Sequence, residues 1–317
     1  MPTIKYGVLK LKKINKIFLF ASLVMVLQFT TMICGCKSKP VISGVPVYTF
    51  NALDSEGAMY IHIPPKENQE LLVAFVKNIY KGLSTDDAEL IVSKLEDVYA
   101  SFGSKKDKKR VQIALKGNVP SIVKSLLKKN GFEEKTYNAK SLIQSKIAPY
   151  SYFDNGDIQI SFPSANQILI SQSIPVFIDM FNMEKEVCNS EIVFETPFRE
   201  DWKGCDLYKW ISEEIPSIHF YIVRPQAFLT NLIGADISTR VFKLVYAKGD
   251  FTKLPNQKYE LTLDLEFQNK IYVKPAISIL ILTLGLTDSE IHQVSDTHIK
   301  LTGVHLNSNQ LINMLGL

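Results

Sequence analysis

The sequence has few of the residues from which catalytic and metal sites are usually built. Among its 317 residues are only four cysteines, five histidines and two tryptophans. It contains no Gly-x-Ser-x-Gly elbow, no phosphate-binding loop, no dinucleotide-binding glycine fingerprint and no His-Glu-x-x-His zinc motif. Neither Cys188 nor Cys205 has a second cysteine or histidine at ligand spacing. We therefore predict no catalytic residue, no metal and no cofactor, and we favour a non-enzymatic protein.

A large excess of positive charge is also missing. The chain has 36 Lys and Arg against 32 Asp and Glu, but five of the lysines lie within its first 16 residues, which contain no acid. Without that segment, 36 − 5 leaves 31 basic against 32 acidic residues. A nucleic-acid-binding domain needs a basic footprint, so the composition excludes nucleic acid as a partner.

What the sequence does contain is an export signal at its start. The basic segment 1–16 is followed by residues 17–33, which carry no charge and are mostly apolar, and then by Gly35. A basic segment, an apolar stretch and a small residue before a cleavage point are the parts of a secretory signal. The alternative is an uncleaved transmembrane anchor, for which this stretch is at the short end of the ~17–25 residues required.

The end of this segment decides between the two. Ile33-Cys34-Gly35-Cys36 resembles the lipobox of bacterial lipoproteins, with Cys34 as its one departure because Ala or Ser is commoner there. The resemblance implies cleavage after Gly35, a diacylglyceryl thioether on the Cys36 sulfur and N-acylation, for example by palmitate. Two or more acyl chains give stable membrane anchoring. Because Lys37 is not the Asp that retains some lipoproteins on the inner membrane, the resemblance favours the outer membrane.

The remaining cysteines, Cys188 and Cys205, have two alternative states. In an oxidising envelope they would form one disulfide that closes a loop of about 17 residues and stabilises the fold by roughly 3 kcal/mol. The other state is a pair of free thiols.

Composition and punctuation divide the chain into four parts. Residues 1–35 are the cleaved signal, and residues 36–47, with two prolines and a glycine, form a lipidated tether. We expect a first folded unit at 48–185 and a second at 186–317.

The periodicity of the folded part predicts an α+β fold with antiparallel sheets and helices packed on one face. Residues 259–267 alternate apolar and polar side chains, which is typical of a strand with one buried face. Asp154-Asn155-Gly156 predicts a hairpin turn, and residues 67–83 and 226–233 have helical spacing. We expect a short strand at 271–273. Residues 276–286 form either a buried helix or a strand, and we favour the helix.

Two weak internal echoes suggest that the halves of the chain are related. Residues 113–117 (IALKG) resemble residues 299–303 (IKLTG), and residues 60–64 resemble residues 221–225 in joining a strand to a helix through proline. The echoes suggest two ferredoxin-like units; the alternative is chance similarity between strand-then-helix segments.

The only concentration of metal-type ligands lies near the C-terminus, where His292, His298 and His305 occur beside Asp288, Glu290 and Asp296. Nothing in their spacing fixes them to one face, so we interpret them as surface residues. His62 and His219 lie in predicted strands and are interpreted as residues of a sheet face.

These observations predict a lipid-anchored protein of the cell envelope, held on the membrane by acyl chains on Cys36, that acts as a non-enzymatic binding or structural module. Two alternatives stay open. One is an envelope hydrolase whose residues converge only in three dimensions, which would show a pocket with titratable groups. The other is a carrier whose sheets enclose an apolar cavity for a lipid or small ligand.

Overall fold

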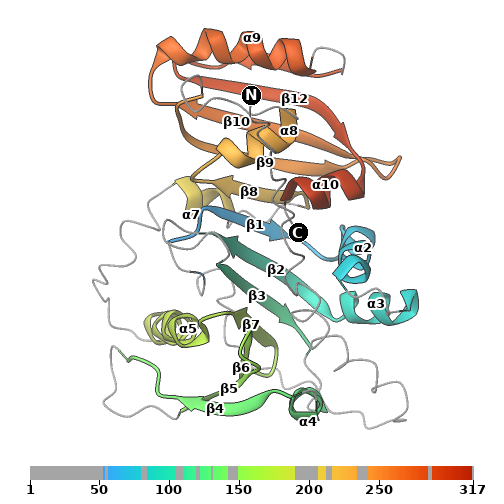
Figure 1. Cartoon of the computed structure of the whole chain (residues 1–317), viewed down its shortest axis with the longest axis vertical. Coiled ribbons are helices and arrows are strands. Elements are labelled where there is room, and N and C mark those ends of the chain that lie inside the picture. The colour runs from blue at the N-terminus through green and yellow to red at the C-terminus, as the bar shows by residue number, and fades with distance from the viewer. Residues whose placement is uncertain are drawn as a thin grey trace, which may run out of the picture.

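The computed structural model describes residues 53, 56–79, 84–103, 110–118, 122–129, 131–141, 149–189, 206–211, 216–233, 242–284 and 288–315. Within them, twelve strands form one sheet in which every paired strand is antiparallel. The sheet runs along the long axis of the molecule (Figure 1) in the order β11-β12-β10-β9-β8-β1-β2-β3-β7-β6-β5-β4. The strands are β1 (Met59–Ile63), β2 (Leu95–Phe102), β3 (Val111–Gly117), β4 (Glu133–Tyr137), β5 (Tyr150–Asp154), β6 (Gln159–Ser164), β7 (Gln167–Ser171), β8 (Ile218–Ile222), β9 (Leu244–Lys253), β10 (Tyr259–Phe267), β11 (Glu290–Gln293) and β12 (His298–Leu306).

The β1–β8 pair divides the sheet into two halves with the same plan. Outward from β1 the neighbours are β2, β3, β7 and β6, and outward from β8 they are β9, β10, β12 and β11. In each half, the first strand is followed by one or two helices and then by a hairpin of two strands. Another helix lies between this hairpin and a second hairpin. Strands β4 and β5 occur only in the N-terminal half. The helices are α2 (Gln69–Ile79), α3 (Thr85–Val92), α4 (Ile122–Lys129), α5 (Ile174–Asn189), α7 (Asp206–Ile211), α8 (Gln226–Ile233), the 3-10 turn η3 (Lys270–Tyr272), α9 (Val273–Leu284) and α10 (Ser308–Leu315).

One face of the sheet, called face A, carries the larger core. Ile61, Leu115 and Leu263 point to this face from three strands and belong to one cluster with buried residues of α2, α3, α4, α8, α9 and α10. The cluster continues across the β1–β8 joint, because Phe220 of β8 also belongs to it and is fully buried. The two halves therefore share one core on this side.

The opposite face, called face B, differs between the halves. Over the N-terminal half and the β1–β8 joint, Tyr60 and Leu169 belong to a second cluster that includes residues of α5 and α7, among them the fully buried Phe177. Over the C-terminal half, the corresponding side chains are polar and only half-buried, as the alternation of β10 predicted: Glu260, Thr262, Asp264 and Glu266.

The structure confirms the α+β class and the antiparallel sheet, and it corrects several details. Helices cover both faces rather than one, because α5 and α7 bury their apolar sides on face B. The segment 271–273 is not a strand: η3 and the start of α9 occupy it, and Asn269 caps η3 by accepting a hydrogen bond from the Ile271 amide at 3.1 Å. The similarity of residues 113–117 to residues 299–303 also relates the wrong strands. β3 has the same place in its half of the sheet as β10 has in the other half, and β12 has a different place. Ferredoxin-like units are not confirmed, because the strands on either side of the first helical segment, β1 and β2 in one half and β8 and β9 in the other, pair directly with each other.

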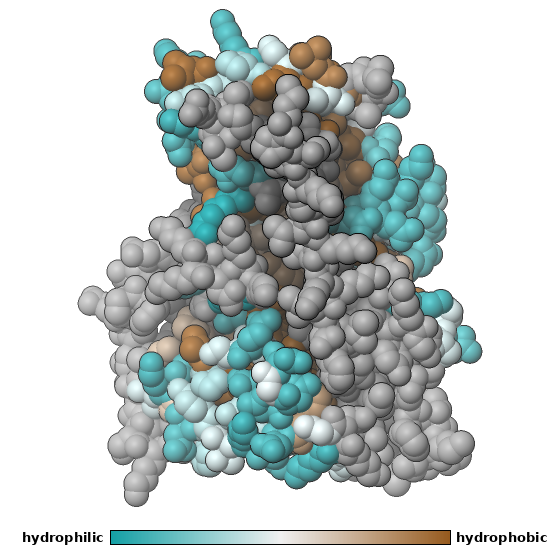
Figure 2. All heavy atoms as spheres, in the orientation of Figure 1, coloured by the Kyte–Doolittle hydropathy of each residue, from teal (hydrophilic) through white to brown (hydrophobic). Residues whose placement is uncertain are grey.

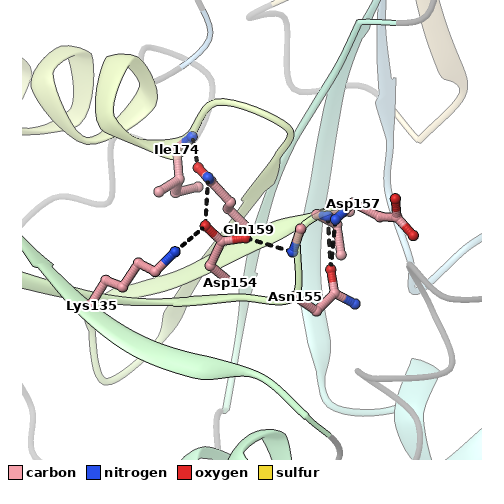
Figure 3. A network of polar contacts seen from close by, with 8 residues as sticks. Lys135, Asp154, Asn155, Asp157, Gln159 and Ile174 are labelled. Atoms are coloured by element: carbon pink, nitrogen blue, oxygen red, sulfur yellow. Dashed lines mark hydrogen bonds and ion pairs between the residues drawn. The ribbon is translucent and has the colours of Figure 1, made fainter.

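The turn predicted at 154–156 lies between β5 and β6 and ties three elements together (Figure 3). Asp154 accepts hydrogen bonds from the Gly156 amide at 2.8 Å, from Lys135 Nζ at 3.0 Å and from Gln159 Nε2 at 3.1 Å. Burial alone would raise the pKa of Asp154, but these three donors together lower it below its ordinary value. Gln159 Oε1 in turn accepts from the Ile174 amide at 2.8 Å, which fixes the first turn of α5.

Candidate functional site

Helix α9 lies at one end of the molecule, beside the outer strands of the C-terminal half (Figure 1). Its sequence is apolar almost throughout, but only one stripe is buried against face A: Val273, Ala276, Leu280 and Leu284. The spacing of three, four and four residues keeps this stripe on one side of a helix of 3.6 residues per turn. The remaining apolar residues of the segment must therefore point elsewhere.

Some of those residues face outward, whereas Ile277 and Ile279 are partly buried against the same core. Ile271 is 64% exposed, Ile281 55% and Leu282 82%, whereas the other large apolar side chains with high exposure in the described part are single valines on separate segments. Figure 2 shows apolar atoms gathered at the end of the molecule where α9 lies. Scattered exposed apolar residues are normal on a protein surface, but their concentration on α9 and on η3, which leads into it, indicates an interaction surface. We call Ile271, Ile281 and Leu282 the α9 apolar face.

The polar groups beside this face are satisfied within the helix itself. Ser278 Oγ donates to the Lys274 carbonyl at 3.1 Å, and Thr283 Oγ1 donates to the Ile279 carbonyl at 2.8 Å. Hydroxyls bonded in this way lose little when water is removed, because an unsatisfied polar group is what makes burial costly. The outward side of α9 is therefore suited to an apolar surrounding.

A cluster of histidine, aromatic and acidic side chains lies on face B where β1 pairs with β8 and the two halves meet. We call it the central cluster. His62 of β1 stands directly across from His219 of β8, and their rings are 6.3 Å apart. His62 stacks on Tyr99 at 4.2 Å, and the Trp210 ring of α7 lies 5.1 Å from that of His219. The same row continues to Asp250 of β9, whose pKa is raised by burial and by the nearby Asp264 and Glu260.

Hydrogen bonds in this central cluster explain its place in the fold. His219 Nδ1 lies 3.1 Å from the Trp210 carbonyl, which can only accept, so Nδ1 carries the proton. Trp210 Nε1 donates to the carbonyls of Phe220 at 3.1 Å and Gly249 at 3.3 Å. Helix α7 is thereby fastened across β8 and β9, next to the joint with β1.

The cluster also contains the arrangement closest to a catalytic pair. His62 Nε2 lies 2.5 Å from Asp97 Oδ1, and His62 Nδ1 is buried without a hydrogen-bond partner among the described residues. A carboxylate that orients a histidine is one part of a nucleophilic hydrolase, but the other part is a hydroxyl or thiol bonded to the free ring nitrogen. The described residues supply no such nucleophile to His62.

The predicted site residues have different outcomes. Gly35, Cys36 and Cys205 lie outside the described residues, as does the side chain of Cys188, so cleavage, lipidation and the disulfide stay predictions. The C-terminal histidines are separated: His292 bonds Glu290 at 3.1 Å and His298 bonds Asp264 at 2.8 Å. Across the described part of the chain, no three His, Cys, Asp or Glu side chains are placed to hold a metal ion.

Sequence reasoning missed the α9 apolar face. It predicted a buried helix at 276–286, because a run of apolar residues does not reveal which side a core covers. The sequence did contain one signal. The buried stripe uses four residues, whereas residues 271–284 contain more than four apolar side chains, so the others could not lie on the same stripe. None of the helices that the structure describes is long and apolar enough to span a bilayer.

Comparisons with known proteins place this arrangement in a family. Crystal forms I and III of TP0453 superpose with TM-scores of 0.60 and 0.59, at 17% and 16% identity, covering 86% and 85% of this chain and 98% of each matched chain. No curated protein sequence matches the chain. The family model described as "Outer membrane-associated lipoprotein TP0453" matches residues 44–312. The chain therefore belongs to the TP0453 family of outer membrane-associated lipoproteins.

Proposed function

We propose that this chain is a lipid-anchored, non-enzymatic binding module of the outer membrane that lays the α9 apolar face against the bilayer. The observation that carries the proposal is the outward exposure of Ile281 and Leu282 on α9 and of Ile271 on η3, which leads into it. Membership of an outer membrane-associated lipoprotein family supports the location, and the lipobox-like segment ending at Cys36 supports the anchor.

The chemistry of α9 is that of a helix lying in the plane of a membrane interface. Such helices bury one apolar side at the headgroup boundary, and their affinity scales with the apolar area removed from water. Full burial of a Leu or Ile side chain contributes about 1.5–3 kcal/mol, so Ile281 and Leu282 together add materially to an acyl anchor. The internal hydrogen bonds of Ser278 and Thr283 keep the cost of desolvation low.

The predicted anchor and α9 can reach the same bilayer. The tether 36–47 spans at most about 43 Å when extended, at ~3.6 Å per residue. From β1 the sheet has four steps to β12, through β8, β9 and β10, which is about 19 Å at ~4.8 Å per step. A chain fixed at Cys36 can therefore bring the α9 end of the molecule to the surface that holds its acyl chains.

The test uses the lipidated protein in vesicles that contain a phospholipid with a photoreactive acyl chain. We expect peptides covering residues 271–284 to be labelled, and we expect Ile281→Asp with Leu282→Asp to remove this labelling. Val176→Asp on α5 is the matched control, because Val176 is also exposed (49%) but lies on another helix. Labelling of wild-type protein elsewhere and not on α9 would refute the membrane contact.

Anchoring is tested separately. Intact-mass analysis of the membrane fraction should find the chain starting at Cys36 with added acyl mass, and Cys36→Ala should lose that mass. An unmodified wild-type chain would refute the anchor.

A further inference from the structure

Three lysines surround the start of α9. Lys270 in η3 and Lys274 in the first turn of α9 are four residues apart, and both are exposed. Lys243, also exposed, precedes β9, and its carbonyl accepts a hydrogen bond from the Gln268 amide at 2.9 Å. Its ammonium lies 5.5 Å from the centre of the Tyr272 ring, which holds it beside the helix. We call Lys243, Lys270 and Lys274 the α9 lysine cluster.

Among the described residues, no ion pair neutralises the positive charge of this cluster. None of the three ammonium groups forms an ion pair with a carboxylate of the described residues. Among the described residues, two acids lie at this end of the sheet. Glu266 is half-buried on face B, and the exposed Asp296 is next to Thr297, whose carbonyl accepts from the Phe267 amide. Three cations against these two acids leave a net positive charge next to the α9 apolar face.

The other end of α9 has the opposite character. Asp288 and Glu290 follow the helix and are exposed, and Glu290 is bonded to His292. Positive and negative charges are thus separated along about 18 Å of helix, at ~1.5 Å per residue. A helix with this polarity would approach an anionic surface with its first turn.

We propose that the α9 lysine cluster binds the phosphates of anionic lipid headgroups and so makes the membrane contact selective for anionic bilayers. This inference rests on the proposed function, because the cluster meets a bilayer only if the α9 apolar face does. Long lysine side chains beside an apolar face can lay their methylenes along it while the ammonium reaches the headgroups. Attraction to an anionic surface strengthens binding by about fivefold per lysine, so the cluster is worth up to about a hundredfold in the contact equilibrium.

The experiment compares photolabelling of residues 271–284 in lipidated protein on zwitterionic vesicles and on vesicles that contain anionic phospholipid. For wild-type protein we expect labelling to be several-fold higher on the anionic vesicles, with the difference lost at high salt, where charges are screened. The variant Lys243→Gln, Lys270→Gln, Lys274→Gln should label equally on both.

The matched control is Lys66→Gln, Lys94→Gln, Lys258→Gln, which removes three exposed lysines away from α9 and changes the net charge equally. It should keep the wild-type preference. If wild-type labelling is equal on both vesicles, or if the α9 triple variant keeps the preference, the headgroup proposal is overturned while the membrane contact stands. If α9 is labelled on neither vesicle, the proposed function itself has failed.

Discussion

The two halves of the chain place a helix at the same position and give it opposite surfaces. Helix α4 follows the first hairpin of the N-terminal half, and α9 follows the first hairpin of the C-terminal half. Both bury residues in the core of face A, Leu127 in one case and Leu280 in the other. The exposed side of α4 carries Lys124, Ser125 and Lys128, whereas that of α9 carries Ile281 and Leu282. The fold therefore does not require an apolar outer side at this position, and its presence on α9 calls for a separate reason.

The two halves also differ on face B, but here the apolar helix belongs to the N-terminal half. The N-terminal half closes it with the apolar side of α5, whereas the C-terminal half leaves half-buried polar side chains such as Asp264 and Glu266. Helix α10, which has the corresponding place after the second hairpin, packs on face A instead. The C-terminal half thus has half-buried polar side chains on face B and a helix with exposed apolar residues on face A.

The first prediction asks whether the halves are one cooperative unit. Phe220 is fully buried beside the joint, with ring contacts to Phe228 at 5.2 Å and Phe251 at 4.9 Å, and Phe153 is fully buried in β5. Phe220→Ala and Phe153→Ala should each cost about 3–5 kcal/mol of unfolding free energy. Because the core of face A is continuous, both should shift one urea transition seen by fluorescence and circular dichroism. Two transitions, with only one moved by each variant, would show independent halves.

The second prediction concerns a buried hydroxyl of the C-terminal half. β3 begins with Val111, but β10 begins with Tyr259, which is 1% exposed and whose hydroxyl has no partner among the described residues. Burial, with a smaller contribution from Glu70, raises the pKa of Tyr259 to about 12. Between pH 10 and 12 the unfolded chain releases this proton and the folded chain keeps it, so stability falls as pH rises, by about 3 kcal/mol in total. Tyr259→Phe should lack this part of the alkaline loss in urea unfolding; an identical loss would contradict it.

The third prediction tests the strands that only the N-terminal half possesses. Asp154→Ala removes the acceptor shared by Gly156, Lys135 and Gln159 and should cost about 1–3 kcal/mol. Because the pKa of Asp154 is lowered in the folded state, its contribution is present above the ordinary Asp range and is lost as pH falls through the folded value. Urea unfolding at neutral and acidic pH should show the difference between wild type and variant shrinking in acid. A constant difference would assign the loss to packing alone.

The sequence was sufficient for elements whose pattern is local. The alternation of β10, the turn at 154–156 and the helix at 226–233 were all predicted, because each depends on neighbouring residues. β4 was missed because Glu133–Tyr137 is almost wholly exposed and shows no buried alternation. The relation of 60–64 to 221–225 agrees with the paired positions of β1 and β8, but the single twelve-stranded sheet depends on long-range pairing that no local pattern contains.

The candidate site was less accessible to sequence reasoning than the fold. Predicting that 276–286 is apolar and helical was correct in type, yet the outward direction of Leu282 depends on which stripe the sheet covers. The His62–His219 pair likewise depends on the register of two strands more than 150 residues apart. The predicted lipid anchor at Cys36 differs from both, because the evidence for it is a motif in the sequence.

The last prediction exchanges the surfaces of α4 and α9, and its effect on stability should be the smallest. Lys124→Ile with Lys128→Leu, made together with Ile281→Asp and Leu282→Asp, changes only exposed positions, each expected to alter the unfolding free energy by about ±0.5 kcal/mol or less. The loss of the exposed Lys128–Glu134 ion pair adds at most about 1 kcal/mol. If an apolar outer side is sufficient for membrane contact, photolabelling should move from residues 271–284 to residues 122–129. If α4 stays unlabelled although the protein is folded and anchored, then the position of α9 beside its lysine cluster is required as well, and the difference between the halves lies in charge as much as in apolar surface.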